Sequence, residues 1–126
     1  MKKIVVMLVI VLVISNTNVN ANTINEAETE LCETLKLALM NSLRDPVDKA
    51  IVKIYKDDVN APKGLRWDTT GAEILKIKQV YGIGGLYEIT LQIEPFYNAH
   101  IGYGIDEVVV TSNGELLRYK HLKTYP

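Results

Sequence analysis

The sequence predicts an α+β fold in which two N-terminal helices pack on one face of a four-stranded antiparallel sheet. Apolar residues follow helical spacing in the first half of the chain, between residues 24 and 55. From Leu86 onward apolar and polar residues alternate, and the pair Asn113-Gly114 marks a tight turn between two further strands. Helices followed by strands with a single apolar face indicate two layers, with the helices covering that face.

The first helix is predicted from Ile24 to Leu43. Thr23 and Glu26 have the spacing of a capping box, and a stripe of small or apolar residues follows at helical spacing: Ile24, Ala27, Leu31, Leu35, Ala38, Leu39 and Ser42. Cys32 is flanked by Leu31 and Leu35, so we expect it to be a buried small hydrophobe; a free thiol is the alternative.

A second helix is predicted to start directly after a turn at Arg44-Asp45. Asp45 can cap this helix, and Pro46 suits its first position because a missing amide proton costs nothing there. One apolar stripe then follows, made of Val47, Ala50, Ile51, Ile54 and Tyr55.

The first predicted hairpin pairs residues 72–80 with residues 87–94, across a flexible turn at 82–85. On the second strand Tyr87, Ile89, Leu91 and Ile93 share the apolar face. A register in which paired numbers sum to 166 matches apolar with apolar and charge with opposite charge. It places Leu75 opposite Leu91, Ile77 opposite Ile89, and Lys78 opposite Glu88.

The second predicted hairpin turns at Asn113-Gly114, two residues that tolerate positive φ angles. A register summing to 227 places Val110 opposite Leu117 and Val108 opposite Tyr119 on the core face. It also pairs Glu107 with Lys120, and Asp106 with His121.

Residues 1–21 have the pattern of a signal peptide. Lys2 and Lys3 precede the apolar run Ile4–Ile14, and small residues end the segment at Ala21. Eleven apolar residues are too short for a bilayer core of roughly 30 Å, which favours cleavage over an uncleaved anchor. We therefore expect a protein secreted or held in the cell envelope after cleavage near Ala21, with a single α+β domain at 22–126.

The composition of residues 22–126 excludes several classes of function. Cleavage leaves 12 basic against 15 acidic side chains, a formal net charge of −3. Nucleic acid is therefore not an expected partner, and a membrane is expected to be contacted only through the signal peptide before cleavage. The one cysteine allows no internal disulfide, and no motif indicates a cofactor.

The connection from Pro95 to Gly104 is the main candidate for a binding site. It is longer than a simple hairpin needs, and it is rich in aromatic residues and glycine. The candidate ligand-binding residues are Phe96, Tyr97, His100 and Tyr103. The alternative is an irregular crossover whose rings fill the end of the core.

A second candidate site follows from the predicted pairing of Asp106 with His121. With His100 in the preceding loop, these side chains could supply three metal ligands. The alternative is a cross-strand pair that only fixes the register. No catalytic nucleophile is nominated, because Cys32 and Ser42 lie in helices and Ser112 lies at a remote hairpin tip.

Three segments resemble a family of short exported bacterial proteins of unknown function, the domain of unknown function 3888: residues 72–78, Tyr87–Glu94 and Phe96–Asp106. The resemblance covers about Leu31 to Leu122. It implies a single domain behind a signal peptide, typically from spore-forming Gram-positive bacteria, and it brings no activity, substrate or cofactor.

Two more distant similarities concern architecture. The order of helices and strands is similar to cystatin-like and nuclear-transport-factor-like folds. The hairpin Ser112–Leu117 is similar to the last hairpin of small domains associated with peptidase regulation.

These observations predict a non-enzymatic binding or interaction domain acting outside the membrane on a protein or a cell-envelope ligand. One alternative is a metal-dependent cell-envelope protein or enzyme that uses His100, Asp106 and His121. Another is an extracellular peptidase inhibitor that acts by strand addition or by insertion of a projecting loop.

Overall fold

The computed structural model describes residues 26–126, with side chains from residue 30 onward. The predicted signal peptide and its cleavage site lie outside the described residues. Residues 33–126 form one compact unit, and only the first turns of one helix are described from the unit before it. Within residues 26–126 no helix combines the length and the apolar character that crossing a membrane requires.

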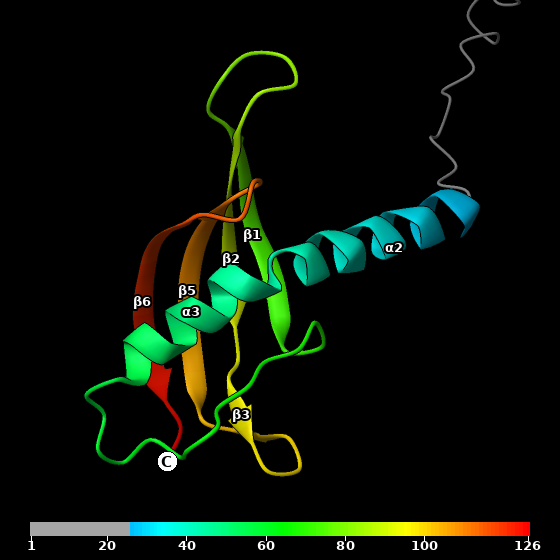
Figure 1. The fold of residues 1–126 in the computed structure, drawn as a ribbon. Helices are drawn as coiled ribbons and strands as arrows, with labels where there is room; N and C mark the ends of the chain where they lie inside the picture. The colour runs from blue at the N-terminus through cyan, green and yellow to red at the C-terminus, as the bar shows by residue number, and fades with distance from the viewer. Residues whose placement is uncertain (1–25) are drawn as a thin grey trace, which may run out of the picture. The chain divides into compact units, whose positions relative to one another are not determined.

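In residues 26–126 two helices precede the strands (Figure 1). The helices are α2 (Glu26–Ser42) and α3 (Arg44–Tyr55), and the strands are β1 (Ala72–Gln79), β2 (Tyr87–Ile93), β3 (Phe96–Tyr97), β4 (Ile101–Gly102), β5 (Gly104–Thr111) and β6 (Leu116–Thr124). The four long strands form one antiparallel sheet in the order β1-β2-β5-β6, and β3 and β4 form a separate two-stranded sheet. The predicted α+β class and four-stranded antiparallel sheet are confirmed.

The break between the helices lies at Leu43, and the predicted cap at Asp45 is wrong. Leu43 is the N-cap residue of α3, with φ −97° and ψ 11°, and no side chain caps the helix. Asp45 lies in the first turn, where its charge still faces the free N–H groups. Leu43 is buried, so a core side chain rather than a polar cap determines where the chain turns.

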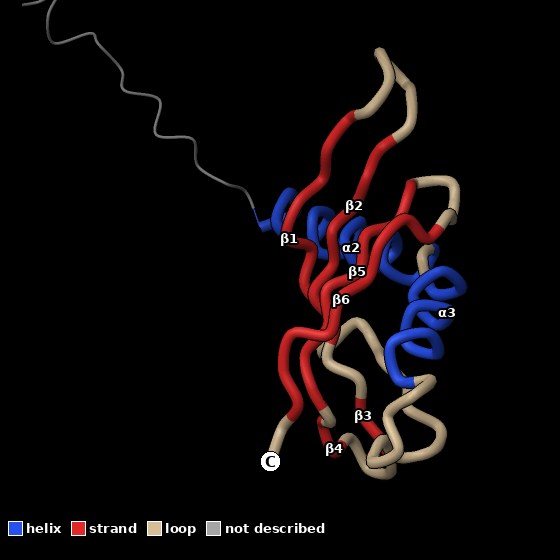
Figure 2. The backbone as a smooth tube through the Cα atoms, turned by 90° about the vertical axis from the view of Figure 1, so that its left-hand side faces the viewer, coloured by secondary structure: helices blue, strands red, loops and turns tan. Residues whose placement is uncertain are grey.

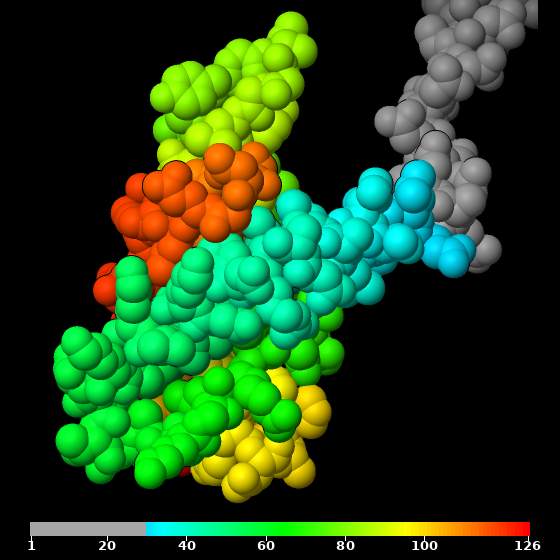
Figure 3. Space-filling model, in the orientation of Figure 1, coloured from blue at the N-terminus to red at the C-terminus, as the bar shows by residue number. Residues whose placement is uncertain are grey.

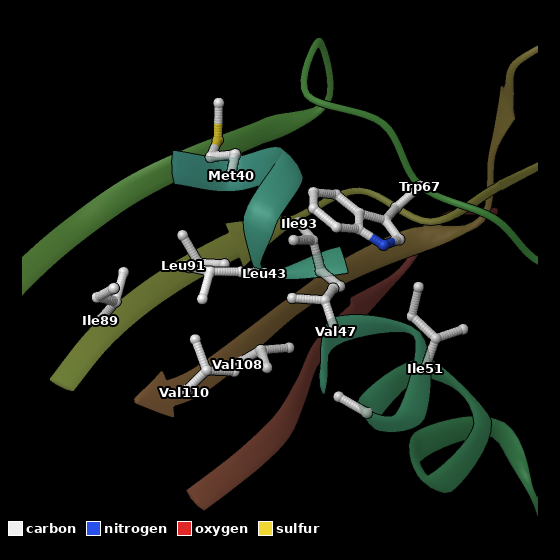
Figure 4. Packing of buried hydrophobic residues seen from close by; sticks show 11 residues of the cluster. Met40, Leu43, Val47, Ile51, Trp67, Ile89, Leu91, Ile93, Val108 and Val110 are labelled. Atoms are coloured by element: carbon white, nitrogen blue, oxygen red, sulfur yellow. The ribbon is translucent and has the colours of Figure 1, made fainter. Parts of the chain in front are cut away.

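The core lies between α3, the end of α2 and the inner face of the sheet. Met40, Leu43 and Val47 contribute from the helical side. Figure 4 shows them among the strand residues Ile89, Leu91, Ile93, Val108 and Val110, with Trp67 and Ile51 at one end. Each large side chain removed from water stabilises the fold by about 1.5–3 kcal/mol, so this cluster holds α3 against the sheet.

The predicted apolar stripe of the first helix is only partly right. Leu35 is 60% exposed and Leu39 is partly buried, whereas Met40 and Leu43 are the residues that enter the core. Cys32 is exposed, so the expectation that it is buried is wrong. Burial begins only in the last turn of α2, because the core residues gather around α3 and the sheet.

The first hairpin has the predicted register over half its length. Paired numbers sum to 166 from Lys76 to Gln79, including Ile77 opposite Ile89 and Lys78 opposite Glu88. A bulge at Leu75 then shifts the register, so Ile74 rather than Leu75 lies opposite Leu91. Leu75 is 46% exposed, which corrects its predicted place in the core. An extra residue in one strand is invisible to a pattern of period two.

The second hairpin follows the predicted register from Asp106 to Val109, where paired numbers sum to 227. Bulges lie at both ends of this stretch, and Val110 pairs with Leu116 instead of Leu117. At the turn Gly114 alone has a positive φ, of 90°, and the Thr111 amide donates to the Glu115 carbonyl at 2.8 Å. The hairpin loop is therefore longer than a two-residue turn, and its glycine adopts the left-handed conformation.

Candidate functional site

The connection between β2 and β5 is an ordered small hairpin. Phe96 pairs with Gly102, and Tyr97 pairs with Ile101. The backbone of Phe96 exchanges two hydrogen bonds with Arg66, of 2.9 and 2.7 Å, which hold the hairpin against the segment after α3. Figures 2 and 3 show this arrangement, with β3 beside the loop that follows α3. The connection therefore contains a regular small hairpin that is held by the segment after α3.

His100 occupies a strained position at the tip of this hairpin. Its φ angle is 60°, and that of Asn98 is 48°, so both lie in the left-handed region. Asparagine and histidine enter that region more often than most other residues, but it remains uncommon for any residue except glycine. Residues held in such conformations cluster at functional sites, which makes His100 a candidate on backbone grounds as well.

The strained backbone places the His100 ring against Phe96. The two rings stack with centroids 4.4 Å apart, and the His100 Nδ1 lies 3.5 Å from the Asp68 Oδ2. The Arg66 guanidinium lies over the Phe96 ring at 5.5 Å and donates to the Asn98 carbonyl at 3.3 Å. A guanidinium, an aromatic ring and an imidazole are thus grouped on one surface.

This surface forms one side of an open pocket of about 490 Å³. The pocket is lined by α3, the segment 65–67 and the small hairpin, through Arg44, Asp48, Ile51, Val52, Leu65, Arg66, Trp67, Phe96 and His100. Trp67 is 2% exposed, and its Nε1 donates to the Asp48 Oδ1 at 2.8 Å. The Arg44 guanidinium lies over the same indole ring at 5.2 Å.

The structure divides the four predicted ligand-binding residues into two groups. Phe96 and His100 line the pocket. Tyr97 pairs with Ile101 in the small hairpin, and Tyr103 turns toward α3 instead. The Tyr103 hydroxyl donates to the Asp58 Oδ2 at 2.9 Å, and its ring meets the Tyr55 ring edge-on at 5.5 Å. Loss of hydration and this carboxylate raise the pKa of Tyr103.

Asp106 and His121 form the centre of a second cluster, and their predicted pairing is confirmed. The Asp106 Oδ1 lies 2.6 Å from the His121 Nδ1, and the carboxylate is fully buried. The Tyr55 hydroxyl donates to the Asp106 Oδ2 at 2.8 Å. On the outer side, the His121 Nε2 lies 2.7 Å from the Thr124 Oγ1. The cluster therefore links α3 to both β5 and β6.

Burial dominates the electrostatics of this cluster. It raises the pKa of Asp106, although hydrogen bonds from His121 and Tyr55 act in the opposite direction. The pKa of Tyr55 is raised far above its ordinary value, first by burial and then by its hydrogen bond to Asp106. Both groups thus favour their protonated forms more than they would in water.

Thr124, His121 and Asp106 follow the order of a nucleophile, a base and an orienting carboxylate. The sequence did not nominate Thr124, because residues three apart on a regular strand point to opposite faces. The bulge between Asp106 and Ile105 brings Thr124 and His121 together. Neither Thr124 nor His121 lines the pocket beside His100, so the two clusters are separate sites. The hydrogen bonds themselves hold the end of β6 in place.

The three predicted metal ligands lie in different surroundings. Asp106 and His121 contact each other, whereas His100 contacts Asp68 and Phe96. Among the residues that the structure describes, no group of three histidine, cysteine, aspartate or glutamate side chains could hold a metal ion.

Several residues of the pocket and of the Asp106–His121 cluster were not predicted as site residues from the sequence. Arg44 was assigned to a turn, and Arg66, Trp67 and Asp48 carried no motif. Tyr55 was assigned to an apolar stripe, and only its position at the end of α3 could have indicated that its hydroxyl meets the sheet. Contacts between residues distant in sequence, such as Arg66 with Phe96, assemble this site.

A family model described as "Protein of unknown function (DUF3888)" matches residues 35–123. The chain belongs to the DUF3888 family. The matched range includes both clusters except Thr124, so the His100 pocket and the Asp106–His121 pair lie within the family domain. DUF3888 carries no assigned activity, so membership supplies no catalytic role for these residues. No curated protein and no solved structure matches the chain.

Proposed function

We propose that this DUF3888 protein is a non-enzymatic binding domain that is exported and acts outside the membrane, with the His100 pocket as its binding site. The observation that carries the proposal is the open pocket of about 490 Å³, which is within the usual size range of small-ligand sites. It combines apolar walls with a few polar groups, the usual composition of such sites.

The backbone around His100 supports the same proposal. A histidine at φ 60° costs about 1–2 kcal/mol relative to an ordinary conformation. The backbone hydrogen bonds between Phe96 and Arg66 hold the hairpin in this shape. A preformed site loses less conformational entropy when it binds, which favours a recognition role.

Export is the second part of the proposal, and it rests on the leader at residues 1–21 and on the similarity to exported proteins of spore-forming Gram-positive bacteria. In the same proposal the helices and sheet form a cystatin-like or nuclear-transport-factor-like sandwich, with both helices on one face. The partner is then a protein or a cell-envelope ligand outside the cytoplasm. Mass spectrometry of the protein from the culture medium and the cell wall tests export. We expect a chain starting at Asn22, and an intact leader in the cytoplasm would contradict export.

Ligand binding is tested by NMR with the ¹⁵N-labelled protein and a fragment set of neutral, cationic and anionic ring compounds. We expect shifts of the Arg66, Trp67 and His100 amides with at least one class of compound. Shifts that are absent with every class, or that occur only at the far end of the sheet around Asn113, would overturn the assignment of the pocket.

A second candidate function is inhibition of an extracellular peptidase. The observation that favours it is the tip of the β1–β2 hairpin, which extends beyond the other strands in Figure 1. Ile83 there is fully exposed and Tyr81 is 68% exposed. A projecting hairpin with apolar side chains has the form of a loop that enters a cleft.

The inhibitor hypothesis is tested with purified serine, cysteine and metallopeptidases. We expect inhibition of at least one class by the native protein and its loss in Ile83→Asp. Val59→Asp is the matched control, because Val59 is equally exposed but lies in the loop after α3. Equal inhibition by both variants would remove the hairpin tip from the proposal.

A further inference from the structure

We infer that the His100 pocket takes an organic anion, in which a carboxylate or phosphate group is attached to a flat apolar body. This inference rests on the proposed binding function and specifies the class of ligand. It is carried by two arginines that line the same pocket and by the apolar side chains that line it with them.

The first guanidinium, that of Arg44, is held in place but not neutralised. Its Nη1 donates to the Trp67 carbonyl at 3.4 Å, and its Nη2 donates to the Asn41 Oδ1 at 3.2 Å. Both acceptors are uncharged and both contacts are long. Its position over the Trp67 ring and these two hydrogen bonds hold the group at the pocket, and its remaining N–H donors form no ion pair with a carboxylate within residues 30–126.

The second guanidinium, that of Arg66, is also held in place by uncharged groups. It lies over Phe96 and donates one hydrogen bond of 3.3 Å, to the Asn98 carbonyl. Neither arginine forms an ion pair with a carboxylate anywhere in residues 30–126. A guanidinium has five N–H donors in a planar fork that fits carboxylate and phosphate oxygens, and most of these donors are free here.

The acidic residues near the pocket already have partners. The Asp48 Oδ1 accepts the Trp67 indole hydrogen bond, and Asp68 lies beside His100. Asp48 is the only carboxylate among the lining residues, against two arginines. The whole chain has a formal net charge of −1, so this local positive charge is not a consequence of a basic composition.

The rest of the lining is apolar and favours a ring. Ile51, Val52 and Leu65 lie on the side of α3 and its loop, and the Phe96 ring lies on the hairpin. Phe96 is stacked with His100 and lies under the Arg66 guanidinium, so the aliphatic side chains supply the rest of the apolar wall. The two charges lie within one pocket and not along a groove, so the site suits a single small anion and not a nucleic acid.

The test is a set of isothermal titrations of the full chain with four probes: phenylacetate, phenyl phosphate, inorganic phosphate and the neutral phenylacetamide. We expect one or both of the ring anions to bind with a Kd of about 10 mM or tighter, the range for a ligand of roughly ten non-hydrogen atoms. The comparison of phenylacetate with phenyl phosphate identifies the preferred anionic group. Inorganic phosphate and the neutral amide are expected to bind at least tenfold more weakly.

Variants then place the binding site. Arg44→Gln and Arg66→Gln should each weaken binding of the ring anion about tenfold, because each removes a charge-assisted hydrogen bond. Arg66→Lys keeps the charge and should recover part of the loss. Arg118→Gln is the matched control: Arg118 is exposed on β6 and paired with Glu88, and its removal should leave the Kd unchanged.

Each contrary result overturns the inference in a recognisable way. If phenylacetamide and phenylacetate bind equally well, and both arginine variants lose this binding, the pocket binds rings regardless of their charge. That result would support the binding function and contradict the proposed anion class. Equal effects of Arg118→Gln and Arg66→Gln would show attraction to the overall charge only. No binding of any of the four probes would overturn the anion class, and the neutral and cationic fragments in the NMR experiment would then decide the binding function separately.

Discussion

The buried carboxylate of Asp106 lies 2.6 Å from the Nδ1 of His121 on the neighbouring strand. Tyr55, which ends α3, donates its hydroxyl to the same carboxylate at 2.8 Å. The Asp106 side chain on β5 is thus the hydrogen-bond partner of one group on α3 and of one group on β6. The following predictions test this arrangement and the geometry around it.

Asp106→Ala should destabilise the protein by about 3 kcal/mol, because the Tyr55 hydroxyl and the His121 ring both lose their buried acceptor. The measurement is urea unfolding followed by circular dichroism. Glu107→Ala is the control, since the neighbouring side chain points to the other face of the sheet and pairs across to Lys120. A loss at Asp106 no larger than at Glu107 would show that the cluster contributes little to the fold.

The stability contribution of Asp106 should depend on pH. Burial raises its pKa in the folded state, so the folded protein holds this proton more tightly than the unfolded chain does. The resulting stabilisation is complete below about pH 4 and is lost as the pH rises through the raised pKa. In urea titrations the advantage of the native protein over Asp106→Asn should therefore shrink from pH 4 toward neutrality. An advantage that grows with pH would show that His121 and Tyr55 outweigh burial.

Tyr55 should make the protein sensitive to alkali. Its pKa is raised by burial and by Asp106, so the folded state keeps the phenol proton after the unfolded state has released it. Stability is therefore lost as the pH rises above about 10. We expect Tyr55→Phe to start less stable at neutral pH and to lose less stability between about pH 9 and 11. Parallel losses in the two proteins would contradict the raised pKa.

Gly104→Ala should destabilise the protein by about 1–3 kcal/mol, the usual cost of overpacking. A Cβ at this position would overlap the Lys123 carbonyl oxygen and lie 3.1 Å from the His121 Cε1. Gly82→Ala provides a matched control, because a Cβ there meets nothing within 4 Å and the residue has no positive φ. Thermal melts of both variants give the comparison, and similar values would rule out a steric requirement for Gly104.

His100→Gly should be more stable than His100→Ala by about 1 kcal/mol, because glycine adopts a φ of 60° without steric cost. Both variants lose the stack on Phe96, so their difference isolates the backbone strain. Ala99→Gly serves as the control, since Ala99 has an ordinary φ and should lose stability through chain entropy alone. If the two His100 variants melt at the same temperature, the histidine conformation is not strained.

Much of the fold was predictable because it depends on local patterns. Alternation from Tyr87 to Ile93 and the Asn113-Gly114 turn identified two hairpins, and the registers chosen for them place Lys78 opposite Glu88 and Asp106 opposite His121. Errors arose where one extra residue enters a strand, as at Leu75, or where a helix end is anchored by a core side chain, as at Leu43. Such features depend on packing between elements and leave no periodic signal.

The candidate site shows the same division. The aromatic loop and His100 stand out in the sequence by composition. The register of the second hairpin also predicts that a carboxylate lies opposite an imidazole. The tertiary structure alone brings Arg44 and Arg66 to the same pocket and joins Tyr55 to Asp106, because these contacts link residues that are distant in the chain. Periodicity reports which face of an element is buried, whereas only the packed fold determines which elements meet and which charges remain without a partner there.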